Sequence, residues 1–500
     1  MIRLAIICFL ISMIESKDFN FGIDQLNKLA LDFEDSKFRM DEATRGQSGN
    51  AAIVIGNGRG GKSTLINYLM GNELVAYRLH NYDSIKIKKA NESIQGPEIG
   101  AGPLSTTTIP LKWKSTRPEL QNLDLWDAAG FSDNRGVEQD LNNSFNLYHL
   151  TKKLDSLKFI LIIGFDDIHN TNIQHILKLL RTLEKYFYYN FEDMFQSISV
   201  IISIAPHQSD NGFPVNYDYL NYKLNSSLLS SPELDISEVS KDFVRYIINN
   251  RQQVAFFRKA EKLGKVHSDI DDNIIPAINN SKSISYSFHQ NVGFPISEYS
   301  KNCLLHAIDD MLILSEFDTL QKQFENLFIE QFDALNKLED TNTLRANKDN
   351  LEKIYNRIDI LAWDNLDAKV KMQILSVNFD TAINFTEDEL LKKINIAEFI
   401  DSLLTTDNME RIHIALDAII NSVYYRIAQL ISLCELKVNQ ISLTDYKEKM
   451  SKDNAMLAKE KKDLQDRIQK LQKEPNQECL LDKFVRNVKE TYTVIVDEIG

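Results

Sequence analysis

The residues best suited to chemistry lie in the segment GNGRGGKS, from Gly56 to Ser63. This segment satisfies the pattern G-x-x-x-x-G-K-[ST], directly after an apolar run and before an amphipathic one. Glycine lets the backbone turn so that successive N–H groups point at a phosphate chain, while a lysine adds charge and a hydroxyl can bind a metal. A glycine-rich loop that only turns a corner is the alternative. We therefore expect a phosphate-binding loop made of Gly56, Asn57, Gly58, Arg59, Gly60, Gly61, Lys62, Ser63 and Thr64.

Two later segments offer ligands for the Mg²⁺ that accompanies a nucleoside triphosphate. The run LDLWDAAG ends with Asp127 and Gly130. An aspartate there can hold Mg²⁺ through water, and a glycine leaves room for its N–H to approach a γ phosphate. In the preceding loop, GPLSTTTIP, we expect Thr107 to complete the metal site, with Thr106 and Thr108 as alternatives. The predicted metal ligands are Ser63, Thr107 and Asp127.

Short apolar runs alternate with amphipathic stretches across the N-terminal half of the chain. The runs are rich in β-branched and aromatic residues, as buried strands are, and they span residues 51–55, 123–126, 158–163, 198–204 and 253–257. Amphipathic stretches such as 169–188 and 234–250 separate them. Strands that alternate with helices predict an α/β fold, with a mostly parallel sheet and helices on both faces.

Glycine and proline divide the chain into two parts. Of 18 glycines, 17 lie at or before Gly293, and neither residue type occurs between Ile296 and Glu474. A stretch of that length without turn residues predicts an all-α region. Within it, leucine or methionine recurs every seven residues from Leu436 to Leu471, although most of the other expected core positions are polar. A coiled coil and a solvated helix with one apolar stripe both fit this pattern.

The first residues, MIRLAIICFLISMIES, have the charged start, short apolar run and polar end of a secretory signal peptide. A hydrophobic N-terminal helix or strand that packs on the next domain is the alternative. The predicted organisation is a signal peptide at 1–16, a helical segment at 17–47, a nucleotide-binding domain at 48–300, a helical domain at 301–435, a long helix or coiled coil at 436–475 and a C-terminal tail at 476–500.

Composition narrows the classes of partner. The 57 basic and 71 acidic side chains give a formal net charge of −14, which argues against nucleic acid or an anionic membrane as the main partner. The four cysteines have no CxxC spacing, so they indicate neither a zinc site nor a disulfide framework. The N-terminal apolar run is too short for an ordinary transmembrane helix, and no second run of about 18 apolar residues follows, so we expect no multi-span membrane protein. Membrane association of another kind stays open.

The motifs resemble those of P-loop GTPases of the TRAFAC class, in the branch that holds septins, immunity-associated GTPases and dynamin-like large GTPases. The resemblance covers about residues 48 to 300 and implies a G domain with Mg²⁺ as cofactor and GTP as substrate. It implies that Thr107 is a switch threonine and that Asp127 and Gly130 open a second switch. Ala129 replaces the proline of that branch, and no glutamine follows Gly130 to orient the attacking water.

Two further residues carry expectations from the resemblance. The N/T-K-x-D motif that binds guanine is absent from ISIAPHQSD at 202–210, where Asp210 is the candidate and a solvated loop residue is the alternative. Guanylate-binding large GTPases place a catalytic arginine at the position of Arg59, supplied in cis once dimers form. An exposed, mobile loop residue is the alternative there. The expected catalytic residues are Lys62, Arg59 and Thr107.

The resemblance implies slow GTP hydrolysis with Mg²⁺, in which the nucleotide state switches conformation or self-assembly through the helical region. A homodimer or oligomer would form through the G domain or the C-terminal helix. Two alternatives stay open: an ATPase with the same phosphate site, and a helical scaffold that binds nucleotide without significant hydrolysis. Nucleotide chemistry favours the cytoplasm, whereas the signal-like N-terminus favours the secretory pathway.

Overall fold

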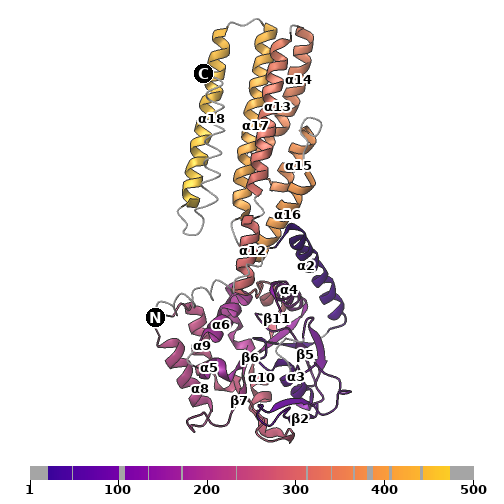
Figure 1. Ribbon diagram of the computed structural model, residues 1–500, viewed down its shortest axis with the longest axis vertical. Helices are drawn as coiled ribbons and strands as arrows, with labels where there is room; N and C mark the ends of the chain where they lie inside the picture. Colours follow the sequence, from indigo (N-terminus) through magenta and orange to yellow (C-terminus); the bar gives the residue numbers. More distant parts are fainter. Residues whose placement is uncertain are drawn as a thin grey trace. The chain divides into compact units, whose positions relative to one another are not determined.

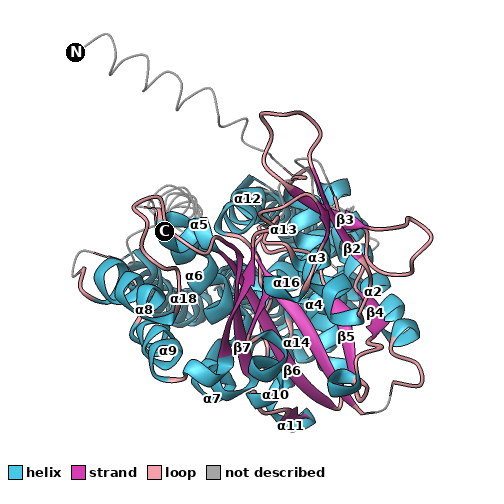
Figure 2. Ribbon diagram, turned by 90° about the horizontal axis from the view of Figure 1, so that it is seen from below, coloured by secondary structure: helices cyan, strands magenta, loops and turns pink. Residues whose placement is uncertain are grey.

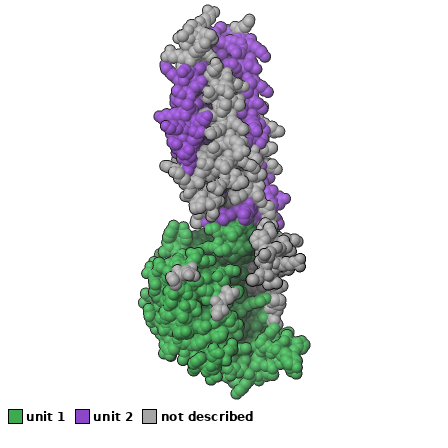
Figure 3. All heavy atoms as spheres, turned by 60° about the vertical axis from the view of Figure 1, so that its left-hand side comes forward, with its two compact units in different colours: residues 1–19, 28–303 green, residues 20–27, 304–500 purple. Residues whose placement is uncertain are grey.

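The computed structural model describes residues 21–47, 49–100, 107–132, 135–170, 173–231, 234–310, 313–338, 340–363, 366–379, 387–404, 408–439 and 443–472. The predicted signal peptide and C-terminal tail lie outside these residues. The chain divides into two compact units, one made of residues 1–19 and 28–303 and the other of residues 20–27 and 304–500 (Figure 3).

The first unit is built on a mostly parallel sheet with the strand order β10-β8-β7-β6-β1-β5-β4 (Figure 2). The strands from β8 to β5 in this order run parallel, whereas β4 and β10 pair antiparallel at the edges and β11 pairs antiparallel with β6. Their bounds are β1 (Asn50–Gly56), β4 (Leu111–Lys114), β5 (Leu123–Asp127), β6 (Ser156–Gly164), β7 (Ile198–Ala205), β8 (Val254–Arg258), β10 (Asp271–Asp272) and β11 (Ile284–Ser285). The predicted α/β architecture with a mostly parallel sheet is confirmed.

Helices cover both faces of this sheet. Ala52 and Val54 of β1 point into a core that α3 (Lys62–Met70) and α10 (Ile274–Asn280) complete. Ile53 and Ile55 point into the opposite core, formed with α4 (Val137–Lys153), α6 (Gln174–Phe187) and α9 (Glu238–Asn249). Burial on both faces explains why the strand residues form continuous apolar runs. The other helices of this unit are α5 (Phe165–His169), α7 (Phe191–Met194), α8 (Tyr217–Leu224) and α11 (Tyr286–His289), and α2 (Ile23–Ala43) belongs to it from Lys28 on.

The order of connections creates a switch point at β1. From β1 the chain passes through α3 on one face and reaches β5 beside β1. From β5 it returns through α4 on the other face and enters β6 on the opposite side of β1. Ligands of open α/β sheets bind in the crevice that such a reversal leaves at the carboxyl ends of the strands. Gly56, at the carboxyl end of β1, lies at this crevice.

A second, smaller sheet accompanies the first, and the sequence pattern did not predict it. Its order is β3-β2-β9, with both pairings antiparallel. The strands are short, with the bounds β2 (Leu74–Tyr77), β3 (Lys86–Lys89) and β9 (Gly264–Lys265). The strand β9 therefore pairs with one edge of β2, although the two strands lie far apart in the sequence.

The second unit is helical, as the absence of glycine and proline predicted (Figure 1). Its helices are α13 (Ile313–Lys337), α14 (Thr341–Trp363), α15 (Ala368–Phe379), α16 (Glu387–Leu404), α17 (Asn408–Asn439) and α18 (Leu443–Gln472), and α12 (Glu298–Asp310) begins in the first unit and enters this one. Helix α17 contacts α13, α14, α15, α16 and α18. Tyr355 of α14 stacks on Tyr424 of α17 with 4.5 Å between ring centroids. The buried Lys371 forms an ion pair with the half-buried Asp417 at 2.6 Å.

The leucine stripe of α18 packs within the chain. Met450, Leu457 and Leu464 are buried, and Leu457 lies in an apolar cluster with Tyr425 of α17. The predicted segment 436–475 falls in two helices. Helix α17 extends to Asn439, and α18 begins at Leu443. A coiled coil between two copies of the chain stays a prediction. Among the helices of the described residues, none is both long and apolar enough to cross a bilayer.

Candidate functional site

The glycine-rich segment forms a tight loop between β1 and α3. Gly56 has a φ of 141°, and a Cβ atom built on it would lie 2.3 Å from the carbonyl oxygen of Ile162 on β6. Any other residue would collide with that strand, so glycine is required here. Gly61 precedes α3 in the left-handed region with a φ of 85° and lets the chain turn directly into the helix. The loop ends with Lys62 and Ser63 in the first turn of α3.

Three predicted metal ligands meet at one carboxylate. The hydroxyl of Ser63 donates a hydrogen bond to Oδ2 of Asp127 at 3.3 Å, and the hydroxyl of Thr107 donates to the same oxygen at 3.1 Å. Asp127 is 2% exposed and ends β5, the strand next to β1. Its other oxygen, Oδ1, is buried and accepts no hydrogen bond within the described residues. Such an oxygen needs a proton, a water or a cation.

Burial and the neighbouring groups shift the pKa of Asp127 in opposite directions. Burial raises the pKa of Asp127 to about 6, whereas the positive charge of Lys62 and the hydrogen bonds from Thr107 and Ser63 lower it. The ammonium group of Lys62 donates to the carbonyl oxygens of Asn57 at 2.8 Å and Gly56 at 3.2 Å. The loop backbone thus holds a buried cation close to a buried carboxylate.

The donor atoms of this cluster suit a hard cation. Two hydroxyls and one carboxylate provide only oxygen, which Mg²⁺ prefers over nitrogen or sulfur. Within the described residues, no group of three His, Cys, Asp or Glu side chains could hold a metal ion. A cation bound by Ser63, Thr107 and Asp127 would therefore take its remaining oxygen ligands from water or phosphate, which is the usual way Mg²⁺ is held beside a nucleotide. The unpaired Oδ1 of Asp127 fits this role.

The segment after Asp127 is bonded to the glycine-rich loop. The N–H of Phe131 donates to the carbonyl oxygen of Gly56 at 3.0 Å, and the N–H of Gly58 donates to the carbonyl oxygen of Phe131 at 3.3 Å. A Cβ atom on Gly130 would lie 2.6 Å from Cα of Gly58 and 2.7 Å from Nζ of Lys62. Only a residue without a side chain lets the two segments approach this closely.

Two residues that sequence reasoning missed support the site. Arg135 donates to the carbonyl oxygen of Thr107 at 2.8 Å. Ser203, at the carboxyl end of β7, donates to the carbonyl oxygen of Gly60 at 2.6 Å. No spacing rule points to Arg135, because its contact depends on how the loop folds. The position of Ser203 near the end of a predicted parallel strand was a usable signal, since such ends meet at one edge of a sheet.

The structure places two other predicted residues at the surface. Arg59 is exposed in the glycine-rich loop and adopts a positive φ of 63°, which is rare for a residue with a side chain. Asp210 follows β7, and its carboxylate is 98% exposed at 3.8 Å from Nε2 of His169. Because β7 is parallel to β1, the loop of Asp210 leaves the sheet at the same edge as the glycine-rich loop. Asn57 and Thr64 lie in and directly after the loop, half-buried.

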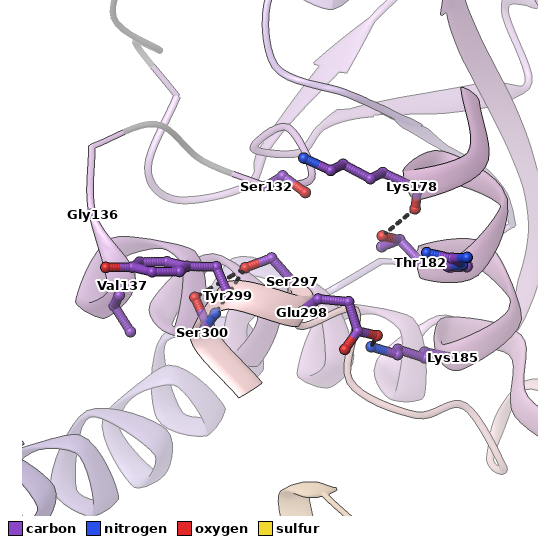
Figure 4. Close-up of a pocket in the computed structure, with 11 residues that line it drawn as sticks. Ser132, Gly136, Val137, Lys178, Thr182, Lys185, Ser297, Glu298, Tyr299 and Ser300 are labelled. Atoms are coloured by element: carbon purple, nitrogen blue, oxygen red, sulfur yellow. Dashed lines mark hydrogen bonds and ion pairs between the residues drawn. The ribbon is translucent and has the colours of Figure 1, made fainter. Parts of the chain in front are cut away.

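A cavity of about 350 Å³ lies beyond Phe131, and no residue of the glycine-rich loop lines it. Figure 4 shows Ser132 and Lys178 on one side of this cavity and Ser297 and Tyr299 on the other. Several of its polar groups are already bonded within the protein: Lys185 pairs with Glu298, and Ser300 donates to Asp140 at 2.7 Å. None of the residues that line this cavity belongs to the cluster around Asp127.

The sequence was also compared with known proteins. No protein-family model matches the chain, and no curated protein matches it. What the structure brings together is Lys62, Ser63, Thr107, Asp127 and Gly130, with the glycine loop from Gly56 to Gly61.

Proposed function

We propose that residues 48–300 form a P-loop GTPase domain that hydrolyses GTP slowly with Mg²⁺. The observation that carries this proposal is the meeting of Ser63 and Thr107 at one oxygen of the buried Asp127, next to the glycine loop. This meeting occurs at the carboxyl edge of a doubly wound sheet, where nucleotides bind in such folds. The nucleotide state would switch conformation or self-assembly through the helical region.

The residues of the site have distinct roles in this proposal. Lys62 would exchange its bonds to the carbonyl oxygens of Gly56 and Asn57 for the β and γ phosphate oxygens of GTP. The loop amides and the N-terminus of α3 would neutralise charge on the leaving oxygen. Ser63, Thr107 and Asp127 would hold Mg²⁺, which supplies charge neutralisation between the β and γ phosphates.

We expect slow turnover because of the residues that follow Gly130. The next residue is Phe131, whose backbone is bonded to the loop, and no glutamine follows to orient a water. Charge neutralisation and positioning would therefore act without a dedicated water-orienting side chain. The segments of Thr107 and Phe131 both contact the phosphate site and are joined through Arg135, which suits them to respond to a γ phosphate.

Guanine as the base is proposed from the family resemblance and from the placement of Asp210 at the edge of the sheet that holds the phosphate loop. The exposed carboxylate of Asp210 is accessible to the N1–H and N2 amino group of a guanine base. Competition of GTP and ATP against a fluorescent GTP analogue tests this choice. Equal displacement by the two nucleotides would favour the ATPase alternative.

The test of the site is nucleotide binding by Lys62→Ala, measured by titration of the fluorescent GTP analogue. We expect affinity to fall by at least about 100-fold, because the variant removes the cation that contacts the phosphates. Lys178→Ala on α6 is the matched control, since Lys178 is exposed and outside the site. Ser63→Ala should keep the fold and remove the dependence of affinity on Mg²⁺. Unchanged binding in both Lys62→Ala and Ser63→Ala would reject the site.

A further inference from the structure

The small sheet β3-β2-β9 carries a charge opposite to that of the whole chain. Residues 77–89 and 259–267 contain seven Lys or Arg and two Asp or Glu, although the chain as a whole has a net charge of −14. At physiological salt, charges further away than about 8 Å are largely screened. The local positive charge therefore decides how this surface meets a partner.

The pairing of the strands brings two loops to one end of the sheet. Tyr77 pairs with Lys86, so residues 78–85 form the loop between β2 and β3. On the other edge of β2, Ala76 pairs antiparallel with Gly264. The residues just before Gly264 therefore lie beside the start of the 78–85 loop.

Large apolar side chains project from these two loops. Leu79 is 60% exposed and Tyr82 is fully exposed in the first loop, and Leu263 is 60% exposed in the second. Single exposed apolar residues are ordinary on a protein surface, whereas three in two neighbouring loops make this end of the small sheet a candidate contact surface. Each of these side chains lies within four residues of a cation in its own loop.

The cations of this surface are exposed, and the ammonium group of Lys88 lies 5.0 Å from the ring centroid of Tyr77. Lys88, Lys259 and Lys262 are exposed, and none of them forms an ion pair within the described residues. Arg78 is exposed and donates only to the backbone of Asn81 among the contacts of its guanidinium given by the structure. We name this surface the basic outcrop, and it consists of Arg78, Leu79, Tyr82, Lys88, Lys262 and Leu263.

We propose that the basic outcrop docks on anionic lipid bilayers. Its leucines can enter the boundary between headgroups and acyl chains, and tyrosine is favoured at that depth. Each Lys or Arg close to an anionic leaflet strengthens binding by about fivefold. Nucleic acid would also attract the cations, but it gives no apolar environment for Leu79 and Leu263. The combination of both features selects a membrane surface.

The test is co-sedimentation of the full-length chain with lipid vesicles. Vesicles of 70% phosphatidylcholine and 30% phosphatidylserine should bind the protein at least about tenfold more tightly than pure phosphatidylcholine, and 0.5 M salt should weaken this binding. The double variant Lys88→Glu/Lys262→Glu should bind at least about 30-fold more weakly, because two attractive charges become repulsive. Leu79→Ser/Leu263→Ser should bind about tenfold more weakly.

Matched variants separate the basic outcrop from general charge and hydrophobicity. Lys322→Glu/Lys353→Glu makes the same change of charge at two exposed lysines of the helical unit. Phe38→Ser removes an apolar side chain that is 64% exposed on α2. Both controls should bind vesicles as the wild type does. Equal binding to the two kinds of vesicle, equal loss in the controls, or capture of RNA without vesicle binding would overturn the proposal.

Discussion

The guanidinium of Arg135 donates a hydrogen bond to the carbonyl oxygen of Thr107, with 2.8 Å between Nη2 and O. The hydroxyl of the same threonine donates to Asp127, so Thr107 is held from both its backbone and its side chain. The contact joins the loop before α4 to the loop before β4. Arg135 is thus a positioning residue that sets the place of the Thr107 hydroxyl beside Asp127.

Arg135→Ala should lower the kcat of GTP hydrolysis about tenfold and change KM less than twofold. Loss of one charge-assisted hydrogen bond costs about 1.5–3 kcal/mol, and the phosphate loop itself is left intact. Phosphate release at saturating Mg²⁺ gives both constants. Arg245→Ala on α9, which removes a surface arginine with exposed ion-pair partners, is the control. An effect of equal size on KM would show that Arg135 contributes to binding and not to the placement of Thr107.

Gly130→Ala should abolish nucleotide binding and leave the fold intact. The added methyl group would overlap Cα of Gly58 at 2.6 Å and force the phosphate loop away from the segment that follows Asp127. The control is Gly164→Ala at the end of β6, where a methyl group meets only the Asp167 carboxylate at 3.3 Å. Titration of the GTP analogue and circular dichroism measure the two properties. Wild-type affinity in Gly130→Ala would show that the loop can accommodate the added methyl group without losing nucleotide binding.

Arg59→Ala should remove the part of GTP turnover that rises with protein concentration. Arg59 is exposed in the phosphate loop, where a cation near the β–γ bridge can neutralise transition-state charge with an effect of about 10³- to 10⁵-fold. Turnover per molecule is compared at dilute and concentrated protein, with Arg78→Ala as the control at another exposed arginine. If concentrated Arg59→Ala is as fast as concentrated wild type, Arg59 has no catalytic role.

His149 should make the folded state lose stability as the pH falls. Burial, and next the charge of Lys37, lower the pKa of His149 to about 4. Its ring packs on Phe33 with 4.6 Å between centroids, and its Nε2 atom has no hydrogen-bond partner among the described residues. An unfolded histidine titrates near 6.5. Between pH 6.5 and 4 the unfolded chain therefore binds a proton that the folded chain does not, and stability decreases.

His149→Gln tests this linkage by chemical denaturation at pH 7.5 and pH 4.5. Wild type should lose about 1–2 kcal/mol more than the variant between these two values. His80→Gln, at an exposed histidine, should behave as wild type does. A parallel decline of wild type and His149→Gln would assign the acid sensitivity to other groups.

The central sheet was predictable because its strands are buried on both faces. Runs such as AAIVI at 51–55 are continuously apolar, and helices follow them in order. The proximity of Ser63 and Asp127 also follows from sequence, because each comes directly at or after the carboxyl end of a strand that the α/β pattern makes parallel. Local signals and long-range topology agree here.

The small sheet could not be predicted in the same way. Its strands have two or four residues, and KIKK at 86–89 carries too few apolar positions to show a period. Its pairing of β2 with β9 joins segments separated by most of the first unit. The hydrogen bond from Arg135 to Thr107 could not be predicted either, because the conformation of the loop backbone decides which carbonyl a long side chain reaches.

The contact between Leu457 and Tyr425 has a consequence for assembly. The apolar stripe of α18 is covered by α17 of the same chain, so a second copy could use it only after this hairpin opens or by exchanging α18 between the two chains. Self-association through the C-terminal region would then compete with an intramolecular contact at very high effective concentration. The contact between α17 and α18 would therefore oppose any dimer that forms through the apolar stripe of α18.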